Sequence, residues 1–149
     1  GQSSRLYRKL VYEDQSALFA AGLFLPRRDV GLFYAFAAVK PGRDRDSLET
    51  VFFHEVDRMA NEAVSEDELV KVKNQLEAQF VFSLEQVQDR ATAVGNAALL
   101  GGDPAGAARR IDRLRAVNGE DIRRVAAKYL TRRNRTVVWV IPAPPRSAS

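Results

Sequence analysis

Two apolar segments close together in the chain, residues 15–25 and 30–39, constrain the fold more than any other feature. In the first, apolar side chains occupy both faces that a strand would present. The turn Pro26-Arg27-Arg28-Asp29 separates the two segments, and Pro41-Gly42 ends the second. The pattern therefore predicts an antiparallel pair of strands whose two faces both carry apolar side chains.

Helical periodicity lies on both sides of this strand pair. Residues Arg5 to Tyr12 read as the last turns of a helix, with Leu6 and Leu10 pointing inward. From Ser47 onward an apolar stripe recurs at helical spacing, formed by Leu48, Val51, Phe52, Val56, Met59, Ala60 and Ala63. The chain is thus expected to enter the first strand directly from a helix and to follow the second strand with another.

The remainder of the chain predicts more helices and one closing strand. Ser65-Glu66-Asp67-Glu68 has the pattern of a capping box, and one long helix is expected from there to Gly101-Gly102. Asp103-Pro104 predicts the start of a shorter helix to about Leu114, and Asn118 caps a helix from Gly119 to about Leu130. Arg135 to Ile141 is a β-branched strand pattern, and residues 142–149 are typical of a linker.

This order of elements defines an α+β class, with an antiparallel sheet and helices packed on one face. A sheet of three strands would leave an apolar edge unpaired, and such an edge invites association. We therefore expect that a strand and most of a helix precede this segment in the parent protein. The free edge could also pair with a second copy, giving a homodimer.

Composition limits the function classes. A length of 149 residues suits one domain, there is no cysteine, and no apolar run is long enough to span a bilayer. No secretory leader pattern is present, and the compartment stays open between periplasm and cytoplasm. Residues 43–93 hold 12 acidic and 6 basic residues, whereas 104–135 hold 3 acidic and 10 basic.

The basic stretch raises a nucleic-acid or anionic-lipid hypothesis, carried by Arg109 to Arg135. Its only aromatic residue is Tyr129, so it lacks a stacking platform for bases. A solvated helix face in an arginine-rich chain is the favoured interpretation. Nucleic acid is therefore not a predicted partner.

The search for catalytic and metal-binding patterns yields no site residue. His54 is the only histidine, and position 58, four residues on, is Arg58, so paired imidazoles on one helix face are absent. Glu66, Asp67 and Glu68 suit helix capping better than cation binding, and Gly101-Gly102 is a helix stop rather than a phosphate loop. We predict no catalytic, cofactor-binding or metal-binding residue in this chain.

Several segments, in order, resemble the C-terminal lobe, or inactive domain, of the M16 peptidases, a family that includes pitrilysin, insulin-degrading enzyme and mitochondrial processing peptidase. The matching segments are Ser4-Arg5-Leu6-Tyr7 with Leu10-Val11-Tyr12-Glu13, Val39-Lys40-Pro41-Gly42, Ser65-Glu66-Asp67-Glu68-Leu69 with Lys73-Asn74-Gln75-Leu76, and Val117 to Leu130. The resemblance implies the LuxS/MPP-like metallohydrolase fold over residues 1–141, incomplete at its N-terminus.

The resemblance also implies a role and partners. Such a lobe packs beside a companion lobe that binds zinc, and helps wall a chamber in which peptides are degraded. In some family members a later lobe carries an arginine and a tyrosine that assist substrate binding by donating hydrogen bonds. The corresponding positions here are Val11 and Leu18, whose side chains cannot donate hydrogen bonds. The leading hypothesis is that the chain is a lobe of a bacterial zinc metalloendopeptidase and is inactive in isolation. The alternative is a scaffold or protein-interaction subunit of the same fold.

Peptide contact, if this lobe makes it, is expected by strand addition along a free sheet edge, where backbone groups bind without demanding a particular sequence.

Overall fold

A short helix opens the structure, a computed structural model that describes residues 2–141. Helix α1 (Arg5–Tyr7) continues into the π-helical turns of η1 (Arg8–Glu13), and the Ser4 hydroxyl caps α1 by accepting a hydrogen bond from the Tyr7 amide at 3.2 Å. The helix expected over residues 5–12 is confirmed. Gln15, at φ 51°, then turns the chain into the sheet.

Strands β1 (Ala17–Leu25) and β2 (Leu32–Val39) form the predicted antiparallel hairpin. The register pairs Ala20 with Ala37 and Leu23 with Tyr34, with an irregularity between Ala17 and Phe19. Because successive side chains alternate between faces, Ala20 lies on the inner face and Tyr34 on the outer face. Within residues 2–141 the sheet has these two strands.

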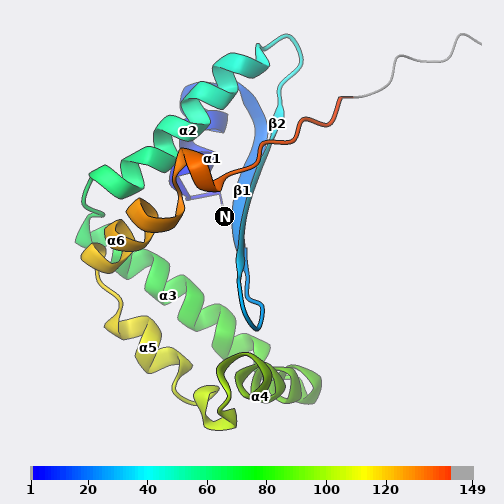
Figure 1. Cartoon of the computed structure of the whole chain (residues 1–149), viewed down its shortest axis with the longest axis vertical. Coiled ribbons are helices and arrows are strands. Elements are labelled where there is room, and N and C mark those ends of the chain that lie inside the picture. Colours follow the sequence, from blue (N-terminus) through cyan, green and yellow to red (C-terminus); the bar gives the residue numbers. More distant parts are fainter. Residues whose placement is uncertain (1, 142–149) are drawn as a thin grey trace, which may run out of the picture.

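The buried core lies between the inner face of the hairpin and the helices. Helix α2 (Arg45–Asn61) begins after Asp44, whose carboxylate accepts a hydrogen bond from the Ser47 amide at 2.7 Å. The expected apolar stripe of α2 faces inward, where Leu48 is buried. The buried cluster consists of Leu10, Ala17, Ala20 and Leu48. Figure 1 shows the hairpin nearly edge-on, with α1 and α2 on the same side of it.

The long helix expected from residue 65 to 101 is instead two helices, α3 (Glu66–Ser83) and α4 (Val87–Gly101). The Ser83 hydroxyl donates to the Phe80 carbonyl at 2.7 Å, and the Leu84 amide is shared between the Phe80 and Val81 carbonyls at 3.3 and 3.1 Å. The Glu85 amide bonds only three residues back, to the Phe82 carbonyl at 3.2 Å, so the α-helical ladder ends here in a 3₁₀-type turn. At the far end, Gly102 supplies the expected left-handed C-cap at φ 71°.

The next segment contains a short 3₁₀ turn, η2 (Pro104–Gly106), and helix α5 (Arg110–Ala116), where one helix to Leu114 was expected. The Asp103 carboxylate accepts from the Ala105 amide at 2.9 Å, as an N-cap should. Helix α6 (Gly119–Tyr129) carries a complete capping box between Asn118 and Asp121. A turn, η3 (Arg132–Asn134), follows it.

The predicted closing strand, Arg135 to Ile141, does not join the sheet, so the expectation of three strands is wrong for this structure. Side chains hold the segment instead. The Arg135 guanidinium lies 3.5 Å from the centroid of the Phe53 ring, and the Trp139 indole N–H donates to the Glu49 carboxylate at 3.1 Å. Both partners belong to α2, so these contacts fasten the segment to a helix. The expected linker, residues 142–149, lies outside the described residues.

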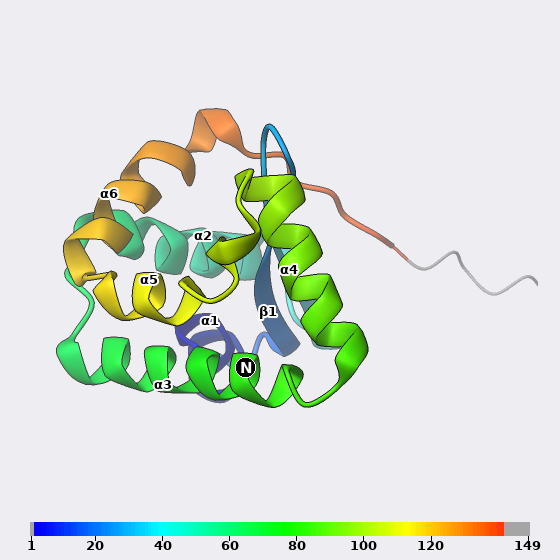
Figure 2. The same cartoon turned by 90° about the horizontal axis from the view of Figure 1, so that it is seen from below.

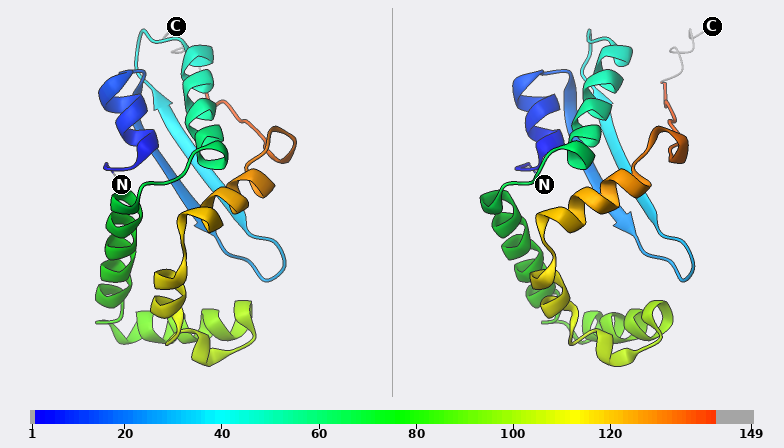
Figure 3. Two further views of the ribbon diagram at one scale, coloured as in Figure 1. Left: turned by 90° about the vertical axis from the view of Figure 1, so that its left-hand side faces the viewer. Right: turned by 60° about the vertical axis from the view of Figure 1, so that its left-hand side comes forward.

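The elements form an arch. Helix α6 packs on α2, and α3 and α5 run side by side toward α4 at the far end (Figure 2). The distal half of the hairpin extends away from the helices (Figure 3). The predicted α+β class, with an antiparallel sheet and helices on one face, is confirmed.

None of the helices in residues 2–141 combines the length and the apolar character needed to cross a membrane.

Candidate functional site

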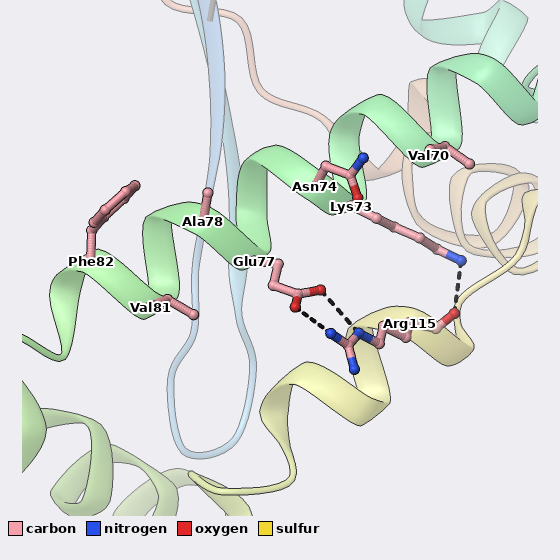
Figure 4. A pocket seen from close by; sticks show the side chains of 8 residues that line it. All are labelled: Val70, Lys73, Asn74, Glu77, Ala78, Val81, Phe82 and Arg115. Carbon is pink, nitrogen blue, oxygen red and sulfur yellow. Dashed lines mark hydrogen bonds and ion pairs between the residues drawn. The ribbon is translucent and has the colours of Figure 1, made fainter.

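An open pocket of about 630 Å³ lies between α3 and α5 (Figure 4). Its wall on α3 is mostly apolar, formed by Val70, Ala78, Val81 and Phe82. Across it, the Arg115 guanidinium pairs with the Glu77 carboxylate, and the Lys73 ammonium donates to the Arg115 carbonyl at 2.8 Å. Each charged group in this pocket therefore has a protein partner. The pocket therefore offers mainly apolar contact area beside these paired charges.

A second, polar pocket of about 470 Å³ lies where α1, α2 and α3 meet. The Arg5 guanidinium donates to both oxygens of the Glu68 carboxylate at 2.7 and 2.9 Å. Nearby, the Arg58 guanidinium bonds to both Glu55 oxygens at 3.0 and 3.1 Å and to Glu62 at 2.7 Å. Glu55 is 4% exposed, so Arg58 compensates a buried charge.

The ion pairs of this second pocket favour the charged form of their carboxyl groups. Hydrogen bonds from Arg5 lower the pKa of Glu68 below its ordinary value of 4.5, and those from Arg58 lower the pKa of Glu62. Glu62 raises the pKa of Arg58 further above its ordinary range, and Glu55 adds to this effect. These groups stay ionised at neutral pH, which suits a structural network rather than proton transfer.

The residues considered for metal binding do not come together. His54 is exposed on α2, and the Arg58 side chain is paired with Glu55 and Glu62. Ser65 caps α3 by accepting from the Glu68 amide at 3.3 Å, as predicted. The reciprocal hydrogen bond of a capping box, from the Ser65 amide to the Glu68 carboxylate, is wrongly predicted, because the Glu68 carboxylate binds Arg5 instead. Among residues 2–141, no three His, Cys, Asp or Glu side chains are grouped to hold a metal ion.

Two positions were singled out by the family resemblance, and the structure places them in different environments. Val11 lies in η1, partly buried against the core. Leu18 lies near the start of β1, at the irregularity between Ala17 and Phe19, and is 54% exposed. Neither side chain has a hydrogen-bonding group.

The basic stretch from Arg109 to Arg135 is largely compensated by its own neighbours. Four of its arginines pair with carboxylates, in the pairs Arg109–Asp103, Arg115–Glu77, Arg123–Glu120 and Arg124–Asp121. Three further cations lie over aromatic rings, namely Arg110 on Phe80, Lys128 on Tyr129 and Arg135 on Phe53. These contacts favour the interpretation of a solvated, internally paired surface over that of an anion-binding face.

The ion pair between the buried Glu55 and the partly exposed Arg58 was not predicted from the sequence. Their spacing of three residues on one helix was the available signal, because side chains at this spacing are neighbours. The ion pair between Arg5 and Glu68 could not be predicted from a local sequence pattern, since 63 positions separate the two residues.

The hairpin's outer face is apolar and exposed, in agreement with the prediction that both faces of the strand pair carry apolar side chains. The exposed fractions of its side chains are Phe19 45%, Leu23 40%, Leu25 39%, Leu32 47%, Tyr34 52% and Phe36 39%. We call these six residues the outer strip.

The fold and these sites describe a domain of α+β architecture. The sequence profile of the peptidase M16 inactive domain matches residues 1–76. The chain therefore belongs to the peptidase M16 inactive-domain family.

Individual relatives agree with this membership. An uncharacterized zinc protease of Streptomyces coelicolor is 27% identical over 133 residues, which are 89% of this chain and 29% of that protein. The chain thus spans less than a third of the length of this curated relative.

Several solved structures share the fold of this chain. The inactive peptidase domain of a candidate zinc protease from Bordetella parapertussis is 25% identical, with a TM-score of 0.84 over 98% of this chain and 78% of that one. A candidate zinc protease from Bordetella pertussis gives a TM-score of 0.83 at 25% identity, over 96% of this chain and 78% of that one. A protease from Helicobacter pylori shares the fold at 23% identity, with a TM-score of 0.78 over 88% of this chain and 31% of that one.

Proposed function

We propose that this chain is the non-catalytic lobe of an M16-type zinc metalloendopeptidase. In this proposal it packs beside a zinc-bearing companion lobe, forms part of the wall of a chamber for peptide substrates and has no activity in isolation. The observation that carries the proposal is the match to a domain described as the inactive peptidase domain of a candidate zinc protease, which covers 98% of this chain.

Zinc belongs to the companion lobe in this proposal, because the residues present here do not fit the metal. A zinc site needs about three or four converging nitrogen, sulfur or carboxylate ligands. The chain has one histidine and no cysteine, and His54 is exposed on α2. Two carboxylates close to it in the sequence, Glu55 and Glu62, are bound to Arg58.

We further propose that residues 1–141 form an incomplete copy of the domain, which a strand and a helix from the parent protein complete. The alignment covers 78% of the Bordetella parapertussis domain, so 22% of that domain (100% minus 78%) has no aligned counterpart in this chain. Apolar side chains on the inner side of the distal hairpin are exposed, with Phe24 at 61% and Phe33 at 43%. A packed helix would bury them.

The first test measures zinc in the full-length protein and searches its companion lobe for His-x-x-Glu-His. We expect about one zinc ion per chain, peptide cleavage, and no change in either when His54 is replaced by Ala. The matched variant replaces the first histidine of that motif and should lose the metal. A loss of zinc in the His54→Ala variant would contradict the proposal, and a full-length protein without the motif or activity would favour the scaffold subunit.

A further inference from the structure

Helices α5 and α6 follow each other in the chain but are stabilised in different ways. Helix α6 begins with the capping box of Asn118 and Asp121 and buries Ala126, which is 2% exposed. Helix α5 has seven residues and no side-chain cap at its N-terminus, and its two large apolar side chains, Ile111 and Leu114, are only partly buried. A helix of this length is unstable by itself in water, so α5 depends on its contacts with the rest of the protein.

Polar groups make the specific contacts between α5 and α3 (Figure 4). The Arg115 guanidinium pairs with the Glu77 carboxylate, and the Lys73 ammonium donates to the Arg115 carbonyl at 2.8 Å. At the other end of α5, the Arg110 guanidinium lies 5.0 Å from the centroid of the Phe80 ring. Each of these contacts involves a cation, and together they tie both ends of α5 to α3.

Contacts of this kind hold a helix weakly. The Arg115 side chain is 61% exposed, and an exposed ion pair adds little to stability because water and salt screen it. A cation over an aromatic ring at the surface is similarly weak. Full burial of an apolar side chain stabilises more than either contact, and α5 has no fully buried side chain. Detaching α5 should therefore cost much less free energy than unfolding the core.

The chain on both sides of α5 can absorb a movement of the helix. Before α5, η2 and residues 107–109 form turns, and after it Val117 is extended at φ −62° and ψ 136°. The neighbouring helices are capped separately, α4 at Gly102 and α6 at Asn118, so their ends do not depend on α5. Residues in turns and at the ends of elements are the usual places where hinges lie.

We infer that α5 is a detachable strap, which closes one side of the pocket between α3 and α5 and is held there by the Glu77–Arg115 ion pair. When the strap detaches, the pocket widens while α2, α6 and the hairpin stay folded. Because the ion pair is exposed to solvent, high salt or the loss of either charge shifts the strap toward the detached state. The inference goes beyond the proposed function and does not depend on it, since all of these contacts lie within this chain.

Hydrogen exchange in the full-length protein, followed by mass spectrometry of its peptides, tests the strap. In the wild type, the hydrogen-bonded amides of α5 should exchange at least about tenfold faster than those of α6, because α5 opens without the core. Glu77→Gln should speed the exchange of α5 by a further factor of about two to five. Salt at about 0.5 M should have a similar effect on the wild type and add little in the variant.

Two further variants show whether the ion pair is responsible. Glu66→Gln makes the same chemical change on α3, about three helical turns before Glu77, and should leave the exchange of α5 unchanged. Arg115→Met should reproduce the effect of Glu77→Gln, and the double variant should exchange no faster than either single one.

Two results would overturn the inference. One is protection of the α5 amides equal to that of the α6 amides in the wild type, which a segment of the parent protein covering α5 would produce. The other is an effect of Glu77→Gln that Glu66→Gln matches, since the charge change and not the ion pair would then be its source.

Discussion

Arg5 and Glu68 show how two side chains join distant parts of this chain. Their bidentate ion pair connects α1 to the first turn of α3, across 63 positions of sequence. The side chains are 22% and 29% exposed, so solvent screens the pair only in part. The pair therefore helps to fix where α3 leaves the core.

The lowered pKa of Glu68 predicts an acid-sensitive contribution to stability. Its pKa in the folded state lies below the ordinary 4.5, so the stabilisation is fully present above that pH and is lost as pH falls through the lowered pKa. Glu68→Gln should reduce the free energy of unfolding at about pH 7, and this difference should shrink toward about pH 3. Urea denaturation at both pH values measures it.

The neighbouring residue provides the control for this measurement. Glu66 lies on the same helical turn and is exposed, so Glu66→Gln should change stability only slightly and without the same pH dependence. A Glu68→Gln effect that stayed constant from neutral to acid pH would show that the ion pair is not its source.

At the scale of elements, local signals predicted more than long-range ones. The hairpin, the caps at Ser65 and Asn118 and the stop at Gly102 all follow from residues a few positions apart, and the structure confirms them. The break between α3 and α4 was missed because the apolar periodicity continues through it. The apolar stripe gives no indication that the Ser83 hydroxyl donates a hydrogen bond to the Phe80 carbonyl.

The closing segment was mispredicted for a different reason. Arg135 to Ile141 has strand propensity, but β-propensity depends on what the strand can pair with. In this structure the Trp139 and Arg135 side chains bind Glu49 and Phe53 of α2. The sequence pattern contains no information about these helix contacts, whose members lie far apart in the chain. For the same reason the polar pocket at α1, α2 and α3 could not be predicted.

Adjacent glycines at the end of α4 give a matched test of the helix stop. Gly102 adopts φ 71°, where a β-carbon is strained, whereas Gly101 lies in the last helical turn with no atom within 4 Å of an added β-carbon. Gly102→Ala should destabilise the protein by roughly 1–2 kcal/mol. Gly101→Ala should be neutral or up to about 1 kcal/mol stabilising. Thermal unfolding of both variants checks this, and equal effects would contradict the assigned C-cap.

At the scale of the whole molecule, exposed apolar surface is the dominant feature. Besides the outer strip, α3 and α4 expose Val81, Phe82, Val87 and Leu99 by 50% or more. Exposed apolar patches on soluble proteins often mark interaction surfaces. This surface is consistent with a lobe that works as part of a larger assembly.

The isolated chain should therefore self-associate. We expect sedimentation velocity on the 149-residue chain to show species larger than a monomer at about 100 μM, and raising the salt concentration should not dissociate them. The full-length protein, in which companion segments cover part of this surface, should associate less. A chain that remained monomeric under these conditions would contradict both this expectation and that of pairing through a free sheet edge.

The position of the buried cluster in the sequence has a consequence for synthesis. Leu10, Ala17, Ala20 and Leu48 make up this cluster, and all lie in the first third of the chain. Short separations between contacting residues favour fast folding. As the chain leaves the ribosome, this core can close once α2 has emerged, before α3 to α6 have emerged. The later helices would then be added to a nucleus that already exists.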